Sequence, residues 1–216
     1  MNVELTWVTP NAEELIVKMA RVSAPSNQDN MDTAPRLLRY LIKHKHWSPF
    51  EMANMCVEIE TTRAISPQIL RHRSFSFQEF SQRYADISDI GSITLPHLRS
   101  QDYKNRQNSN DDLKERLGGE KLAHFYRRMS TILEDSKHLY QEMLSEGVAK
   151  ESARFILPLS TPTRLFMNGT IRSYIHYLQV RTDPSTQLEH RQIALAIKDI
   201  FCQQFPVIGE AVFGKQ

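Results

Sequence analysis

The segment from Arg71 to Tyr84 is the part of the chain richest in side chains that bind ligands. It holds three arginines, one histidine, three serines and one glutamate, interleaved with aromatic residues. A guanidinium presents a planar fork of donors that matches phosphate oxygens two at a time, and serine hydroxyls can complete such a site. The aromatic side chains, among them Phe75 and Phe77, could anchor the segment or stack on a ligand ring. The segment therefore indicates an anion-binding site.

Composition alone leaves two other interpretations of this segment open. In one, a basic helix end runs into a solvated loop whose phenylalanines pack inward, because clustered charges are often only surface. In the other, the arginines track the phosphates of RNA or single-stranded DNA while the aromatic rings stack on bases. The order of the residues is what favours a third interpretation.

That order resembles the RHRxxSxxxxSxR signature of the flavin-dependent thymidylate synthases, with Arg71-His72-Arg73, Ser76, Ser81 and Arg83 at its fixed positions. Further segments are similar to the same family in the same order. They are Ala20–Ser23, His44–Glu51, Ala153–Leu159, and the arginines at 172 and 181. The resemblance thus extends from about residue 12 to about residue 205.

Membership in that family would imply reductive methylation of dUMP to dTMP. It implies bound FAD, methylenetetrahydrofolate as carbon donor, NADPH as reductant, and a homotetramer with shared active sites. Carried over by position, the flavin contacts are Ser23, His46, Ser48, Glu51, Arg71, His72, Arg73, Glu79, Thr170, Arg172 and His176. The dUMP contacts are Gln68, Arg71, Glu79, Phe80, Ser81, Gln82, Arg83, Arg154 and Arg181. The chain departs from many members at Gln78, and from some members at Gln82 and Thr170.

The chemistry of the proposed reaction assigns the catalytic roles to Arg181 and Ser81. The C5 carbon of uracil is a poor nucleophile, and a fixed cation beside the ring oxygen would stabilise the negative charge that develops there. Arg181, which is permanently charged, is the candidate. Arg83, Arg154 and the loop around Ser81 would hold the nucleotide phosphate. Ser81 is read as a phosphate or ring ligand, because a serine nucleophile needs an adjacent base and the sequence assigns none.

Other cofactor chemistry finds little support in the sequence. The histidines lack a recognised zinc spacing, so no metal is expected, and His44 and His190 are read as surface or packing residues. Cys56 and Cys202 are read as structural. No P-loop, GxGxxG or GxSxG motif is present.

The elements that must position these residues are mostly helical. Apolar periodicity predicts helices near residues 12–20, 37–44, 120–146, 150–157, 170–180 and 187–205. Asn11, and Ser66 before Pro67, are expected N-caps, the second opening a short helix that ends near Arg71–Arg73. Strands are expected at 55–60 and near 164–168, with 86–118 rich in loops. The fold class is α+β: one domain over residues 1–216, mostly helical, with a small central antiparallel or mixed sheet.

The bulk composition fits this picture. The 216 residues are 40% hydrophobic with a formal net charge of +2, so charge gives no reason to expect a nucleic-acid or membrane partner. Two distant cysteines form no disulfide framework, which suits a reducing compartment. No leader or membrane-spanning run is expected, and the predicted location is the cytoplasm.

Overall fold

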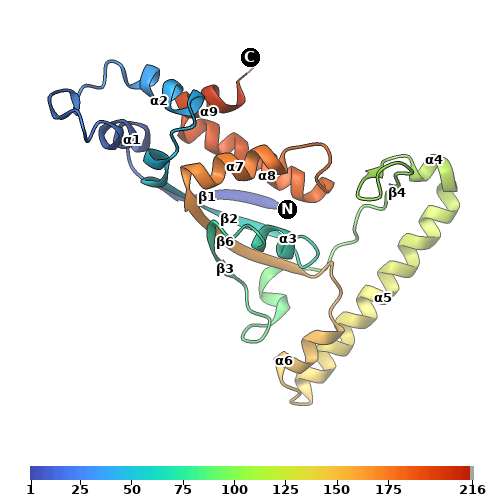
Figure 1. The fold of residues 1–216 in the computed structure, drawn as a ribbon. Helices are drawn as coiled ribbons and strands as arrows, with labels where there is room; N and C mark the ends of the chain where they lie inside the picture. The colour runs from blue at the N-terminus through green and yellow to red at the C-terminus, as the bar shows by residue number, and fades with distance from the viewer. Residues whose placement is uncertain (215–216) are drawn as a thin grey trace.

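A four-stranded antiparallel sheet forms the centre of the protein in the computed structural model, which describes residues 1–214 (Figure 1). Its strands, in spatial order, are β1 (Asn2–Val8), β2 (Asn54–Thr62), β6 (Pro162–Thr170) and β3 (Phe75–Glu79). The α+β class with a small central sheet is confirmed, and every strand pairing is antiparallel.

Two strands of this sheet, β1 and β3, were not predicted from the sequence. β1 pairs with β2 through a bulge between Leu5 and Trp7. β3 lies in the middle of the Arg71–Tyr84 segment, for which a solvated loop was one of the interpretations left open, and it pairs with β6. On β6, Gly169 faces Phe75 so closely that a Cβ atom there would lie 2.3 Å from the Phe75 ring. The edge strand with the RHR-containing segment therefore depends on this glycine.

Helices cover the sheet and enclose the main core. They are α1 (Ala12–Ala20), α2 (Ala34–Lys43), α3 (Ser66–Leu70), α7 (Ile171–Arg181), α8 (Leu188–Gln204) and α9 (Pro206–Phe213), with short turns η1 (Pro25–Asn27) and η2 (Ser48–Glu51). α8 contacts β1 and α7 follows directly from β6, while α2 packs on α9 (Figure 1). The fully buried Tyr174, Phe201 and Met55 show how sheet and helices share one apolar core.

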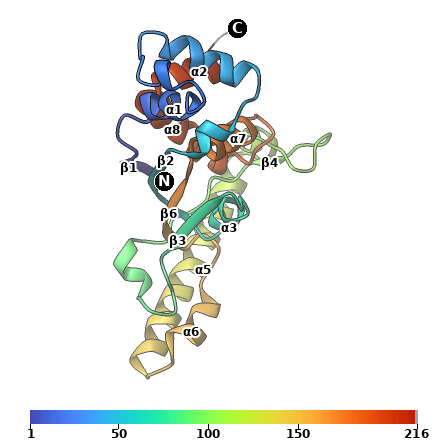
Figure 2. The same ribbon diagram turned by 60° about the vertical axis from the view of Figure 1, so that its left-hand side comes forward.

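A second group of elements extends away from the sheet (Figures 1 and 2). It comprises η3 (Ile87–Ile90), β4 (Ser100–Gln101), β5 (Ser109–Asn110), α4 (Leu113–Leu117), the long α5 (Gly119–Ser145), α6 (Lys150–Ala153) and η4 (Arg154–Ile156). Its own core is small and centres on Ile87, Tyr140 and Ala153. Arg99 joins this group to the start of α8 through two bonds to Glu189, of 2.6 and 3.0 Å. The extent of the domain, predicted as residues 1–216, stays a prediction.

Two of the expected helix caps turned out differently. Asn11 precedes α1 as predicted, but it adopts a left-handed conformation and its side chain caps nothing. Ser66 is the first residue of α3, not its cap, because its hydroxyl donates to Glu79 instead. The helix predicted over 150–157 is split into α6 and η4. In the described part of the chain, no helix is both long and apolar enough to span a membrane.

Candidate active site

A cavity of about 630 Å³ lies between η2 and the first turns of α7. Three predicted flavin contacts line it, Glu51, Arg172 and His176. Its other lining residues, which the sequence analysis did not single out, are Lys45, Trp47, Ser74, Ser173, Ile175 and Gln179. Lys45 and Trp47 lie within the His44–Glu51 stretch that resembles the family, and that position could have marked them as site residues.

The wall of this cavity is built where β6 turns into α7. Thr170 caps α7 by accepting a hydrogen bond from the Ser173 amide, at 3.2 Å. Its hydroxyl also donates to Glu51 over 2.8 Å, and Arg172 bonds the same carboxylate at 2.7 Å. Thr170 and Arg172, at the junction of β6 and α7, are thereby both bonded to Glu51 on η2. Thr170 therefore serves both as the helix cap and as a partner of Glu51.

At the other end of α7, Arg181 meets the histidine of the RHR segment. Its Nε donates to Nε2 of His72 over 2.8 Å. Burial, helped by the nearby charges of Arg181 and His176, lowers the pKa of His72 to about 4. His72 is therefore neutral near pH 7 and can accept this bond, and the two terminal NH₂ groups of Arg181 remain for another ligand.

Behind this pair lies His190, whose imidazole is completely buried. Its Nε2 is 3.0 Å from the hydroxyl of Tyr177, and Tyr177 in turn packs edge-on against the His72 ring. Burial, with smaller contributions from Arg181 and His72, lowers the pKa of His190 to about 3. Of the two roles left open for His190, surface or packing, the structure supports packing.

Glu79 ends β3 in a dense polar contact. Its carboxylate accepts from Ser66 at 2.6 Å and from Thr163 at 2.9 Å, and it forms a 2.6 Å ion pair with Arg63. Arg63 was not among the predicted residues, although it directly follows β2 and precedes α3. Glu79 is thus held in place by a cation and two hydroxyls.

The proposed phosphate ligands lie near the outlying helices. Arg83 forms a 3.2 Å ion pair with Glu151 of α6, and Arg154 begins η4 on the next turn. Arg83 and Glu151 are both well exposed, so the pair is open to competition by solvent and by other anions. The neighbouring Gln82 is buried, with a side-chain nitrogen that finds no partner among the described residues.

The remaining predicted residues are dispersed over the surface. Gln68 donates to Gln187 at 2.7 Å, and Phe80 is half-buried at the end of β3. The exposed ones are Ser23, His46, Ser48, Arg71, Arg73 and Ser81. Of the aromatic side chains in the segment, Phe75 is buried in the main core and Tyr84 is 87% exposed, so they do not form one stacking surface.

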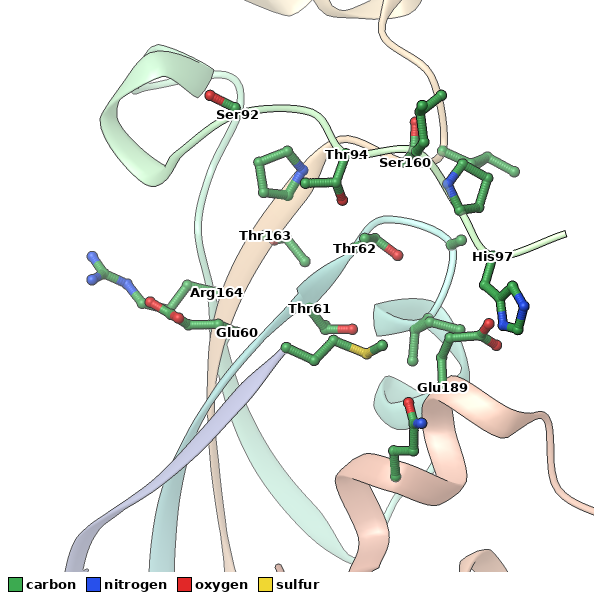
Figure 3. A pocket seen from close by; sticks show the side chains of 18 of the residues that line it. Glu60, Thr61, Thr62, Ser92, Thr94, His97, Ser160, Thr163, Arg164 and Glu189 are labelled. Carbon is green, nitrogen blue, oxygen red and sulfur yellow. The ribbon is translucent and has the colours of Figure 1, made fainter. Parts of the chain in front are cut away.

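A larger cavity, of about 690 Å³, lies between the sheet and the crossing segment 89–99 (Figure 3). Hydroxyl-bearing side chains line much of it, including Thr61, Thr62, Thr94 and Ser160. None of the predicted site residues lines it. Size therefore does not identify the site in this chain. In the described part, no cluster of three or more histidine, cysteine, aspartate or glutamate side chains could hold a metal ion.

Taken together, these residues could bind an extended anionic ligand and hold a planar ring. The smaller cavity has two cations, Lys45 and Arg172, against one carboxylate, Glu51. The Arg181 guanidinium is oriented by a neutral histidine, and Arg83 with Arg154 offers a separate cationic point. These places are spread along β3 and α7, and neither of the two cavities described above is lined by all of them.

Comparison with known proteins gives one consistent result. The family described as Thy1, thymidylate synthase complementing protein, matches residues 4–207. The chain is 51% identical over 202 residues to a probable flavin-dependent thymidylate synthase of Paramecium bursaria Chlorella virus 1, covering 93% of this chain and 90% of the relative. It is 51% identical over 200 residues to the flavin-dependent thymidylate synthase of Synechocystis, covering 93% and 89%.

A similar solved structure is that of the UMP/dUMP methylase PolB from Streptomyces cacaoi, bound with 5-Br dUMP. The TM-score is 0.82 at 27% identity, over 97% of this chain and 93% of PolB.

Proposed function

Because the chain belongs to the flavin-dependent thymidylate synthase family, we propose that it methylates dUMP to dTMP with bound FAD. Methylenetetrahydrofolate would supply the carbon and NADPH the reducing equivalents. The single observation that carries the proposal is the Arg181–His72 contact. This contact holds His72 of the RHR segment, which lies just before β3, against the arginine that is expected to bind the uracil ring. The compartment we propose is the cytoplasm, from the two unpaired cysteines.

The residues around the smaller cavity fit a flavin dinucleotide. The cavity volume of about 630 Å³ lies in the usual range for small-molecule sites. Lys45 and Arg172 suit the diphosphate, Trp47 offers a flat apolar surface, and His176 and Gln179 add hydrogen-bonding groups. When bound, FAD would supply the hydride and one-carbon chemistry. Glu51 would keep Arg172 in place until a diphosphate competes for it.

The protein's own part in the reaction is to bind, orient and stabilise charge. Arg181, held through Nε, would direct its NH₂ groups at the uracil carbonyl, where negative charge develops as C5 becomes nucleophilic. Glu79, held by Arg63, Ser66 and Thr163, would accept hydrogen bonds from the nucleotide. Arg83 and Arg154 would bind the phosphate, with Ser81 and Gln82 beside it. Fixing both reactants would remove much of the entropic barrier.

We further propose that the active sites are shared between subunits of a homotetramer. Support comes from the separation of the predicted ligands, since the cavity on α7 and the cationic point at Arg83 lie at different ends of β3. In an oligomer, a second chain could place its Arg83 next to the α7 cavity of the first chain.

Two measurements test the proposed function. The purified protein should show flavin absorption bands. It should also form dTMP from dUMP only when methylenetetrahydrofolate and NADPH are both present. A yellow protein that binds dUMP without forming dTMP under these conditions would identify a relative that has lost turnover. A colourless protein that binds RNA with a steep dependence on salt would contradict the proposal altogether.

A further inference from the structure

An unpartnered apolar row runs along α5. Phe125, Ile132 and Leu139 are 39%, 59% and 41% exposed. They are spaced seven residues apart, so they share one face of the helix, as in a coiled-coil seam. The helix packs on its own chain through a different side, where Tyr140 is buried beside Met143 and Leu144. The row therefore faces away from the chain's own core.

A row of charges lies directly beside the apolar row. Its members, Lys121, Arg128, Asp135 and Glu142, are exposed and are also spaced seven residues apart. The two in the first half of the helix are basic and the two in the second half are acidic. None of the four forms an ion pair with any residue in the 1–214 range. This arrangement leaves both charge blocks available to a partner.

We propose that α5 pairs with α5 of a second copy of this chain, antiparallel and about a two-fold axis at Ile132. Ile132 is the midpoint of the Gly119–Ser145 helix. The two-fold axis would bring Phe125 against Leu139 of the second copy and Ile132 against its own counterpart. Such an interface is self-complementary, as a two-fold axis requires. The apolar row is then buried from both sides, which is the main favourable contribution to association.

The charge row selects the orientation. In the antiparallel pair Lys121 faces Glu142 of the other copy, and Arg128 faces its Asp135. In a parallel pair the charge rows of the two copies would lie on opposite sides of the apolar row, so these ion pairs would not form. The same charges make an unrelated helix a poorer fit, because few sequences present the reversed pattern at the same spacing. This inference rests on the assembly part of the proposed function, not on its chemistry.

Cross-linking tests the orientation. In a Cys56→Ser, Cys202→Ser background, we would place one cysteine at 121 in one sample and at 142 in another. Antiparallel pairing predicts disulfide dimers after the two samples are mixed and allowed to exchange, and none in either sample alone. Two cysteines at 121 would lie about 33 Å apart, at 1.5 Å of rise per residue. Dimers in the single samples would overturn the antiparallel arrangement.

Mass tests the seam itself. Ile132→Asp places a charge at the centre of the row and should halve the assembly mass measured by light scattering. Arg127→Asp, an exposed position on another side of α5, is the matched control and should leave the mass unchanged. Lys121→Glu with Arg128→Glu should raise the dissociation constant about tenfold. Adding Asp135→Lys and Glu142→Lys should restore it.

The outcomes separate this inference from the proposed function. A wild-type tetramer whose mass survives Ile132→Asp would overturn the α5 seam alone. A wild-type monomer would overturn the seam and the tetramer together. Flavin absorption and dTMP formation, measured on the wild-type protein, judge the reaction independently of either result.

Discussion

Nε of Arg181 is tied to Nε2 of His72 at 2.8 Å, which turns a flexible arginine at the end of α7 into an oriented one. The histidine can serve this way because its low pKa keeps it neutral. One ring nitrogen accepts from Arg181 and the other must then carry the proton. Arg181 thus uses its Nε–H in a hydrogen bond within its own chain, and its two NH₂ groups stay available for a ligand.

Arg181→Lys should impair the enzyme far more than the conserved charge suggests. Lysine cannot bond His72 and a ring carbonyl at the same time in a fixed plane. We expect kcat/KM for dUMP to fall about a hundredfold or more while flavin absorption persists. Arg191→Lys, at a half-buried arginine of the neighbouring α8, is the control. Near-normal dTMP formation by Arg181→Lys would show that Arg181 does not hold the ring.

The buried histidines should make stability depend on pH. In the folded state the pKa is about 3 for His190 and about 4 for His72, below the ordinary value near 6.5. The unfolded chain therefore takes up protons first as the pH falls, and folding weakens below about pH 6.5. Between pH 7.5 and 5, the wild-type protein should lose about 2 kcal/mol more stability than His190→Gln. Denaturant titrations at both pH values measure this, and equal losses would refute it.

Removing the carboxylate that competes for Arg83 should tighten dUMP binding. Glu151 holds Arg83 at 3.2 Å, so Glu151→Gln frees the guanidinium for the nucleotide phosphate. We expect the dissociation constant of dUMP to fall severalfold at low ionic strength, with the gain shrinking at high salt because screening weakens exposed charges. Glu146→Gln at the end of α5 is the control. A salt-independent dUMP affinity in the wild-type protein would contradict an arginine-dominated phosphate site.

Replacing both cysteines should leave thymidylate formation largely intact. Burial raises the pKa of Cys56 and of Cys202, so neither thiol is poised to attack uracil. We predict that the folded Cys56→Ser, Cys202→Ser variant forms dTMP at a rate close to wild type. Loss of all activity with flavin still bound would point to a thiolate adduct.

Gly169→Ala should destabilise the edge of the sheet that carries the RHR segment. The added Cβ would lie 2.3 Å from the Phe75 ring, and overpacking of this kind costs about 2 kcal/mol. Gly119→Ala, where nothing lies within 4 Å, should be neutral or slightly stabilising. The free energy of unfolding from denaturant titration checks both, and a neutral Gly169→Ala would mean that β3 can shift.

Sequence periodicity located most helices because their apolar faces recur every three to four residues. It also found β2 and β6, which alternate clearly. β3 was not predicted because its alternation, Phe75-Ser76-Phe77-Gln78, is short and lies within a segment rich in ligand-binding side chains. The burial of Phe75 against Gly169 becomes clear only from the strand pairing. The family motif predicted a set of site residues, but not the contacts that these residues make. Arg63 contacts Glu79, and His190 contacts Tyr177, only through the packing of separate elements.

The difference in size between the two cores has a consequence for cooperativity. The sheet and its helices share a broad apolar interior, while the outlying elements depend on Ile87, Tyr140 and Ala153 with few neighbours. Regions with so little buried surface open locally at a lower free energy than the whole molecule. Amide hydrogens of α5 should then exchange with solvent well before those of β2 and β6. Hydrogen exchange in an isolated chain should therefore show two groups of amides with different free energies of opening.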